Sequence, residues 1–322
     1  MITRNDVTAH LERGMRVGFL SGRRDYASLR DRISRTVESD GAFETYVDMG
    51  AHPWPKHNGG QVGQGADDQR TDAPVTGGLL DPQEVAIVGA NEKALIVYNR
   101  DWDVTIGITH NAINDNNVGS LETWAMDAGA SFEKHMDYLC FTALNTGASA
   151  SSDFGACYDG LPLFSASHVD PNASYTTVQD NEFTLALSNA NFNTVYIAAS
   201  KFKDSQGNYG GYNHSLLVHA VDLREEAAQI TQNAEKSGTS NRDINVNFGE
   251  IDRMSVPGGW LDSTAWFVVD DGGVAKPINL QIRQSPKLVF WDDEMKKMRY
   301  YKWESRYEVF YGDWRLIAQG NT

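Results

Sequence analysis

The strongest hydrophobic pattern in the chain is a single apolar stripe between Ser120 and about Gly147. This spacing predicts a long helix with one buried face. Ser120 suits the N-cap position, and Gly147 suits the position just past the last turn. At a rise of 1.5 Å per residue the helix would be roughly 40 Å long, so we expect other elements to pack along it. The stripe consists of Leu121, Ala125, Ala128, Phe132, Met136, Leu139 and Ala143.

Before this helix, apolar spacing predicts two short helices within residues 3–38, from Asp6 to Val17 and from Tyr26 to Val37. Alternating patterns then predict strands from Phe43 to Met49 and from Leu95 to Ile108. The segment between these strands is rich in Gly, Pro and Asp and has little to bury. Together they predict a long projecting hairpin. Because an isolated hairpin is barely stable in water, we expect this arm to lie on a neighbouring subunit.

After the long helix, the pattern from about residue 180 is typical of a compact α/β domain. Asp222 and Glu225 predict a reciprocal capping box at the start of one helix. The predicted elements are a helix from Ser188 to about Lys203, a buried strand from Ser215 to Ala220, a helix from Asp222 to Thr231, and strands from Phe248 to Met254 and from Trp266 to Val269.

The tail from Ile278 to Ala318 is rich in strand sequence. Aromatic and aliphatic residues alternate there with charged ones, which predicts a half-buried antiparallel strand. The apolar positions are Tyr301, Trp303, Tyr307, Val309 and Tyr311.

Charge and composition exclude several classes of protein. The 322 residues carry a formal net charge of −15, which argues against a protein whose main role is to grip nucleic acid. A basic stretch from Arg23 to Arg35 stands out and could be a solvated helix face, a contact to another subunit, or a contact to nucleic acid. The N-terminus begins no signal peptide, and no run of about 18 apolar residues suggests a membrane segment. Cys140 and Cys157 are expected to be reduced thiols.

No motif for catalysis, a cofactor or a metal emerges from the sequence. The histidines, cysteines and acidic residues show no ligand spacing, so we expect no metal site and no cofactor. Ser149, Ser151 and Ser152 would be nucleophiles only if a histidine and an acid converged on them. We therefore expect no catalytic residue and no enzymatic activity.

The order of the parts resembles the major capsid protein of tailed phages, the Hong Kong 97-like fold. Local sequence is similar to the Mu-like phage major head subunit family within that group. The similar segments are Asn99 to Gly119, Cys157-Tyr158-Asp159-Gly160 with Leu163-Phe164 and His168, Leu216 to Ile230, Ala275-Lys276-Pro277 through Gln281 with Arg283 and Pro286, and Gly312-x-Trp314. Residues 54–79 are unusually Gly-rich for the family, so contacts of the arm cannot be carried over by residue.

The resemblance implies an α+β fold with an N-arm, an extended β E-loop, a long spine helix, a P-domain and an α/β A-domain. The implied divisions are an N-terminal arm at 1–41, the E-loop region at 42–110, the P-domain at 111–180 with the spine helix at 120–147, the A-domain at 181–274, and C-terminal P-domain strands at 275–322.

The implied function is that of the major capsid protein of a tailed phage or prophage. Copies would form pentamers and hexamers of an icosahedral shell around non-specifically packaged dsDNA, assembled in the host cytoplasm and retained in the virion. The implied partners are a separate scaffolding protein, a portal and, as a further candidate, decoration proteins. Candidate assembly contacts are Trp54, Lys56, His57, Arg70, Arg24 and Arg30.

Three alternatives stay open at this point. The first is an encapsulin-like compartment shell with the same fold. The second is a carbohydrate or cell-surface binding protein, suggested by Trp54, Trp260 and Trp291 among loop-rich strands. The third is a hydrolase that uses a Ser/His pair.

Overall fold

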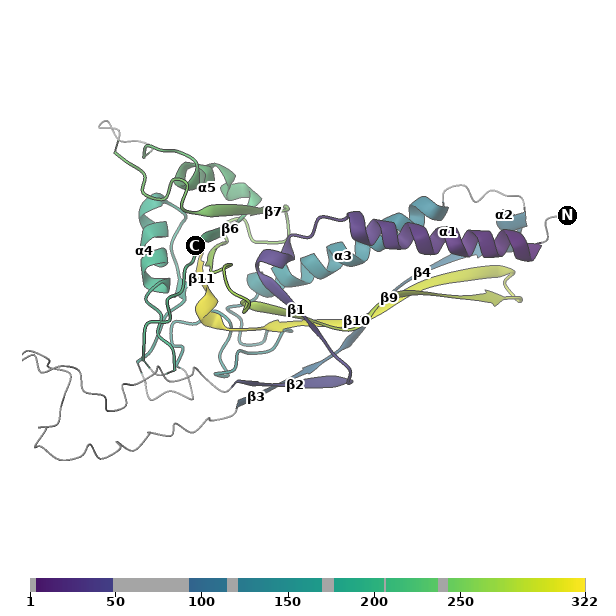
Figure 1. Ribbon diagram of the computed structural model, residues 1–322, viewed down its shortest axis with the longest axis horizontal. Coiled ribbons are helices and arrows are strands. Elements are labelled where there is room, and N and C mark those ends of the chain that lie inside the picture. Colours follow the sequence, from purple (N-terminus) through teal and green to yellow (C-terminus); the bar gives the residue numbers. More distant parts are fainter. Residues whose placement is uncertain are drawn as a thin grey trace, which may run out of the picture.

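The computed structural model describes residues 4–48, 93–114, 121–169, 177–205, 207–236 and 243–321. In this part of the chain the molecule has a broad end and a long narrow end (Figure 1). The helices are α1 Arg4–Asp25, α2 His110–Asn114, α3 Leu121–Asn145, α4 Asn189–Ala199 and α5 Arg224–Thr231, with 3-10 turns at Arg30–Arg32, Val221–Leu223 and Trp314–Leu316. The strands are β1 Ser34–Glu38, β2 Phe43–Asp48, β3 Lys93–Tyr98, β4 Arg100–Thr109, β5 Glu182–Phe183, β6 Leu216–Ala220, β7 Asp252–Val256, β8 Trp266–Val269, β9 Ile278–Asp293, β10 Met298–Tyr311 and β11 Ile317–Gly320.

The predicted long helix is confirmed as α3, and every residue of its predicted apolar stripe is buried. Gly147 plays a different role from the one predicted, because its φ is not among the positive ones. A Cβ at this position would lie 2.7 Å from the Phe164 ring, so the glycine allows that ring to approach the end of the helix.

The prediction of two helices within residues 3–38 is wrong in its second half. A single helix, α1, is followed by a 3-10 turn and by β1, which pairs in parallel with β9. Leu29, Ile33 and Val37 are spaced four apart, which imitates a helix stripe. The backbone instead extends because β9 offers a full ladder of partners, from Ser34 opposite Ile278 onward.

The narrow end is built from a four-stranded sheet with the order β1-β9-β10-β4. The alternation predicted for the tail is confirmed, since Tyr301, Trp303 and Tyr307 of β10 are fully buried. The ring of Trp303 stacks on Phe19 of α1 at a centroid distance of 5.9 Å. The helices therefore cover the face of this sheet to which the aromatic residues of β10 point (Figure 1).

A separate two-stranded ribbon leaves this sheet. Strand β2 pairs antiparallel with β3, with Phe43 opposite Tyr98 and Asp48 opposite Lys93. The predicted hairpin is thus confirmed at its base. The rest of the predicted arm, residues 49–92, lies outside the described residues.

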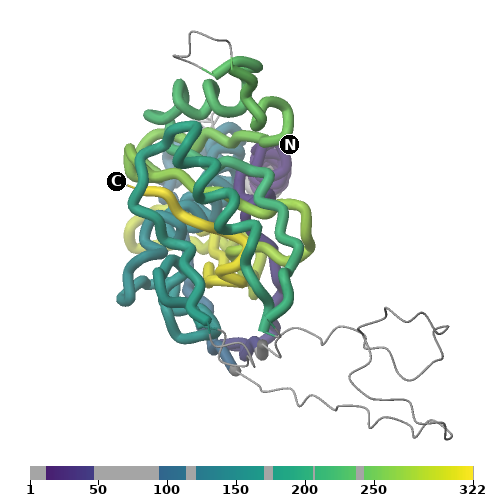
Figure 2. Tube along the Cα trace, turned by 90° about the vertical axis from the view of Figure 1, so that its left-hand side faces the viewer, coloured from purple at the N-terminus to yellow at the C-terminus, as the bar shows by residue number. Residues whose placement is uncertain are grey.

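The broad end contains a five-stranded sheet with the order β5-β11-β8-β6-β7. The C-terminal strand β11 lies inside this sheet, where Figure 2 shows it in yellow among green segments. The predicted strand from Ser215 to Ala220 is confirmed as the buried β6. Ser188 caps α4 by accepting a bond from the Asn191 amide at 3.2 Å. These connections place the last strand of the chain between β5 and β8.

Two predicted details of the broad end are wrong. The capping box of Asp222 and Glu225 does not form, because Val221–Leu223 is a 3-10 turn and α5 starts only at Arg224 without a side-chain cap. The strand predicted from Phe248 starts later, at Asp252. The amides of Phe248 and Glu250 bond back to nearby carbonyls in a turn, so they are not available to a sheet ladder.

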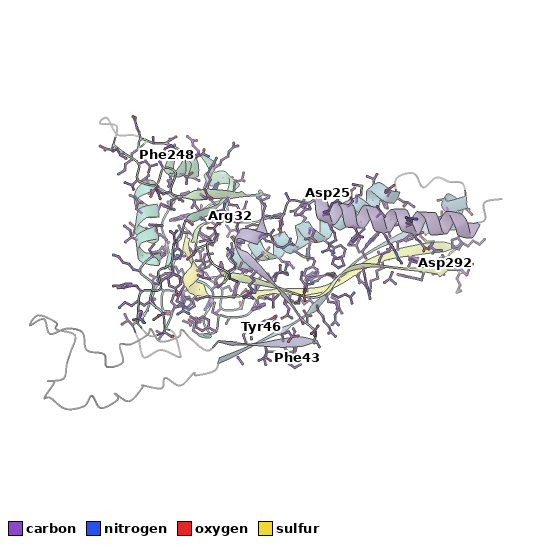
Figure 3. All side chains as sticks on the ribbon, viewed as in Figure 1. Asp25, Arg32, Phe43, Tyr46, Phe248 and Asp292 are labelled. Carbon is purple, nitrogen blue, oxygen red and sulfur yellow. The ribbon has the colours of Figure 1, made fainter. Side chains whose placement is uncertain are left out.

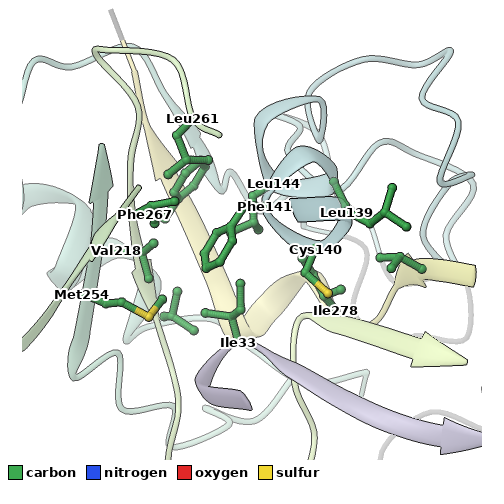
Figure 4. Close-up of a cluster of buried hydrophobic side chains, with 14 of the residues drawn as sticks. Ile33, Leu139, Cys140, Phe141, Leu144, Val218, Met254, Leu261, Phe267 and Ile278 are labelled. Carbon is green, nitrogen blue, oxygen red and sulfur yellow. The ribbon is translucent and has the colours of Figure 1, made fainter. Parts of the chain in front are cut away.

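One continuous core joins the two ends of the molecule. The C-terminal part of α3 contributes Phe141 and Leu144, which lie near Val218 and Phe267 of the five-stranded sheet (Figure 4). Ile278 at the start of β9 belongs to the same core. The end of α3 therefore fixes the broad end against the narrow end.

Candidate assembly surfaces

The N-terminal segment is tied to α3 by a buried ion-pair network. Asp137, which is fully buried, accepts bonds from the Tyr26 hydroxyl at 3.1 Å, the Ser28 hydroxyl at 3.0 Å, the Leu29 amide at 2.9 Å and the Arg30 guanidinium at 2.7 Å. Burial, reinforced by the Asp137 charge, raises the pKa of Tyr26 to about 12. The basic stretch is therefore neutralised here by a carboxylate of its own chain.

Two further arginines of the basic stretch also pair within the subunit. Arg23 contacts Glu133 at 2.7 Å, and Arg32 pairs with Asp252 at 3.0 Å and with Asp271. Arg32 lies between the narrow and the broad ends (Figure 3). The alternative of a freely solvated helix face is therefore wrong for these side chains.

The predicted assembly residues fall into three groups. Arg24 is on the surface, where its side chain is 79% exposed beside Asp25. Arg30 is buried and binds Glu133 and Asp137 of its own chain at 2.7 Å each. The remaining four, Trp54, Lys56, His57 and Arg70, lie outside the described residues. As contacts between subunits, all of them stay predictions.

The ribbon of β2 and β3 has two different faces. Its inner face rests on the four-stranded sheet, where Val97 is buried and Tyr46 stacks on Phe310 at a centroid distance of 4.6 Å. Its outer face carries three large apolar side chains in solvent, which sequence reasoning did not single out. Figure 3 shows Phe43 on the side of the ribbon away from the sheet and Tyr46 on the side facing it. The exposed fractions are 50% for Phe43, 51% for Ile96 and 66% for Tyr98.

A second apolar group lies at the tip of the broad end. Ile244, Val246 and Phe248, between α5 and β7, are each more than half exposed. Figure 3 places Phe248 at the far edge of this end. Large apolar groups gathered in solvent mark a contact site more often than an ordinary surface. The tip and the ribbon are therefore the two candidate assembly surfaces.

Two side chains of types that can carry chemistry, those of His168 and Ser152, form contacts within their own chain. His168 is fully buried, contacts Asp159 at 2.5 Å and the Leu163 carbonyl at 3.2 Å, and stacks on Trp314. Ser152 bonds to the Tyr311 hydroxyl at 2.7 Å. Among the described residues no group of His, Cys, Asp or Glu could hold a metal ion, and no helix is long and apolar enough to span a bilayer.

The tryptophans behind the carbohydrate alternative are packed against neighbours where they are described. Trp260 contacts the rings of Tyr138 and Phe141, and Trp291 stacks on Tyr300 at 5.2 Å. Trp54 lies outside the described residues. Cys140 and Cys157, which the sequence predicts to be reduced thiols, are free, and the structure also buries them. Burial raises the pKa of the Cys140 thiol to about 12.

Near the point where the ribbon joins the sheet, Glu308 is a buried acid with an altered pKa. Burial raises its pKa to about 7, although Arg100 of β4 contacts it at 2.9 Å. The Arg100 guanidinium also donates to the Asp153 carbonyl at 3.1 Å. Protonation of Glu308 therefore changes the charge balance at the start of β4.

We expect the Glu308→Gln variant to gain stability relative to the parent as pH rises. An acid with a raised folded pKa stabilises the fold below its unfolded pKa, and this stability is lost between pH of about 4.5 and 7. The variant should therefore exceed the parent by about 1–3 kcal/mol at pH 8 and lose that advantage at pH 4.5, measured by urea unfolding.

Glu304→Gln on the same strand is the matched control. The hydrogen bond from Lys287 lowers the pKa of Glu304. Removal of the Glu304 carboxylate should therefore lower the free energy of unfolding at pH 8, whereas removal of the Glu308 carboxylate should raise it. A Glu308→Gln difference that does not change with pH would contradict the prediction.

Residues 85–184 match the model of a family described as the Mu-like prophage major head subunit gpT. The comparison with curated proteins found no match. The fold is similar to that of the bacteriophage JBD30 procapsid, at 18% identity and a TM-score of 0.55 over 98% of this chain and 75% of that chain. A structure of Microbacterium phage Oxtober96 matches at 12% identity and a TM-score of 0.53, over 91% of this chain and 90% of that one.

A virus-like particle from Pyrococcus furiosus has a similar fold at 10% identity and a TM-score of 0.52, over 96% of this chain and 98% of that one. The α+β Hong Kong 97-like fold expected from the sequence is thereby confirmed. The family match over residues 85–184 agrees with the resemblance found in the sequence.

Proposed function

We propose that this chain, a Mu-like phage major capsid protein by its family match and its fold, builds an icosahedral shell of pentamers and hexamers around dsDNA. The observation that carries the assembly mechanism is the two-faced ribbon. Its inner face is fixed on its own subunit, and its outer face exposes Phe43, Ile96 and Tyr98. A second copy of the chain is the partner whose apolar surface would cover that outer face.

Shell building is a mechanical role that needs no catalytic residue. Many weak contacts repeated around rings add up to a stable container, because each bound neighbour raises the effective concentration of the next contact. The tip residues Ile244, Val246 and Phe248 supply a second such contact in this proposal. With a net charge of −15, the interior would hold DNA without sequence preference.

The remaining parts of the proposal concern partners and place. We propose a separate scaffolding protein, a portal and decoration proteins as partners, with assembly in the host cytoplasm and the finished shell in the virion. The family match supports this setting, since the matched family is described as the major head subunit of a Mu-like prophage. The chain would act without a cofactor.

An encapsulin-like compartment is the second candidate, favoured by the similar fold of the virus-like particle. The two candidate functions predict different contents inside the assembled particles. Particles purified from phage-producing cells should contain long dsDNA if the chain is a head protein. Particles that contain protein cargo and no DNA would favour the compartment.

Assembly tests the proposal directly. We expect the parent chain to form rings or shells visible by negative-stain microscopy, and the double variant Phe43→Ser/Tyr98→Ser to fold and yet assemble poorly. Each buried aromatic is worth about 1.5–3 kcal/mol, and the loss recurs at every copy of the contact. Met295→Ser is the matched control, because Met295 is an almost fully exposed apolar residue in the turn after β9.

The measurements are sedimentation velocity for the assembly state and circular dichroism for the fold. Double-variant shells that resist denaturant as well as the parent would show that the outer face of the ribbon makes no contact between copies. A parent that stays a monomer at all protein concentrations would overturn the proposed function itself.

A further inference from the structure

The ribbon is attached to the four-stranded sheet at two opposite edges. In the sheet order β1-β9-β10-β4, β1 leads into β2, and β3 leads into β4. Figure 1 shows β1 running down to the ribbon and β3 returning to β4. The ribbon therefore has to cross the two central strands, β9 and β10. What it contacts during this crossing decides its angle to the subunit.

One buried side chain on β9, that of Gln281, bonds to the ribbon strand β2 and to the residue that joins β3 to β4. The Gln281 amide nitrogen donates to the Asn99 side-chain oxygen at 2.8 Å, at the junction of β3 and β4. The Gln281 amide oxygen accepts a bond from the Tyr46 hydroxyl of β2, also at 2.8 Å. Gln281 is fully buried, so neither end can exchange its partner for bulk water.

The direction of these bonds is fixed at one end. The Asn99 amide nitrogen donates to the Gly41 carbonyl at 3.1 Å and to the Ser39 hydroxyl at 3.1 Å. A carbonyl can only accept, so the Asn99 oxygen must face Gln281. It follows that the Gln281 oxygen faces Tyr46, and this relay of hydrogen bonds donates in one direction, from the Tyr46 hydroxyl through Gln281 and Asn99 to the Gly41 carbonyl.

The turn that starts the ribbon belongs to the same network. One oxygen of Glu44 accepts from the Ser39 hydroxyl at 3.0 Å and from the amides of Asp40 at 3.0 Å and Gly41 at 2.9 Å. The backbone bond from Gly41, followed by those from Ser39 and Asp40, lowers the pKa of Glu44. The turn is therefore held in one shape, and Gln281 links that shape to the sheet.

We propose that Gln281 is a positioning residue for assembly, because it binds β2 of the ribbon and Asn99, the residue that joins β3 to β4, and so sets the angle at which the arm leaves the subunit. This inference rests on the proposed function, in which the outer face of the ribbon meets a neighbouring copy. A shell closes only when every copy presents its arm at a compatible angle. A looser ribbon would give open or misshapen particles from folded subunits.

The test measures the ribbon angle apart from assembly. Cys140 and Cys157 are buried, so spin labels can be attached selectively to cysteines placed at the exposed Thr45 of the ribbon and the exposed Thr105 of β4. Labelled subunits are diluted into unlabelled protein, and the distance distribution between the labels is recorded. The variant is Gln281→Met, which keeps the length of the side chain and removes both polar ends. Gln284→Met on the same strand is the control.

We expect one narrow distance distribution for the parent and for Gln284→Met, and a distribution at least twice as broad for Gln281→Met. Shells of Gln281→Met should include many open or irregular particles. A Gln281→Met distribution as narrow as that of the parent overturns the proposal. If that variant does not fold, Tyr46→Phe decides, because it keeps the stacked ring and removes only the hydroxyl.

The two proposals fail in different ways. A parent that never assembles overturns the shell function, while the label distances still test the relay. A parent that assembles, together with a Gln281→Met variant that has parental distances and parental shells, overturns the positioning role alone.

Discussion

Replacement of Asp137 by asparagine should lower the free energy of unfolding of the subunit by about 3–5 kcal/mol. The carboxylate accepts bonds from four donors of the N-terminal segment, and it is fully buried. An asparagine would turn an amide nitrogen, itself a donor, toward donors such as Arg30. The buried guanidinium would also lose one of the two carboxylates that neutralise it, and an uncompensated buried charge is costly.

Urea unfolding at pH 7, followed by circular dichroism, measures this effect. Asp127→Asn is the matched control, because Asp127 is exposed on the same helix and should change stability by less than about 0.5 kcal/mol. Equal unfolding midpoints for the two variants would show that Asp137 does not hold the N-terminal segment. We also expect Asp137→Asn to make the segment around Tyr26 more sensitive to protease, since its anchors are lost.

Patterns that repeat along one element were predictable from the sequence. The stripe of α3 and the alternation of β10 each come from many residues that face the same core, so each side chain adds to the same signal. The base of the ribbon was predictable for a related reason, because alternating apolar and polar residues flank the long polar segment on both sides. These elements supplied the order of parts on which the family resemblance depended.

Elements fixed by distant partners were not predictable. The segment from Tyr26 to Val37 has helix-like spacing, and what extends it is the ladder offered by β9, more than 200 positions later. The capping box at Asp222 failed for a similar reason. A motif of four residues shows only that a helix can start at Asp222. The chain leaves β6, which pairs in parallel with β7, through a 3-10 turn at Val221–Leu223, and this turn takes the place of the predicted helix start.

The candidate assembly surfaces also depend on distant partners that local sequence patterns do not show. Exposure of Phe43, Ile96 and Tyr98 depends on which face of the ribbon rests on the sheet, and alternation alone gives two equal choices. Gln281 stood in a motif of the resembled family, but its partner Asn99 lies 182 positions away. Arg30 looked like a surface cation because Glu133 and Asp137 are more than 100 positions from it in sequence.

Two glycines of α1, the helix that packs on α3, should respond to replacement by alanine with opposite changes in stability. Alanine is favoured over glycine inside a helix by about 1 kcal/mol, so propensity alone predicts that Gly14→Ala and Gly22→Ala both stabilise α1. The surroundings differ. A Cβ at Gly14 would meet nothing within 4 Å, whereas a Cβ at Gly22 would overlap the backbone carbonyl of Met126 on α3. Gly129 of α3 makes the reciprocal approach to the Phe19 carbonyl.

We therefore expect Gly14→Ala to raise the free energy of unfolding by up to about 1 kcal/mol and Gly22→Ala to lower it by about 2–3 kcal/mol. A carbonyl cannot rotate away as a side chain can, so Gly22→Ala has to push the two helices apart. That displacement weakens the packing of Phe19 on Phe132 and Trp303. Urea unfolding of both variants against the parent measures the two signs. If Gly22→Ala stabilises the subunit as much as Gly14→Ala does, the helices do not pack in close contact at this point.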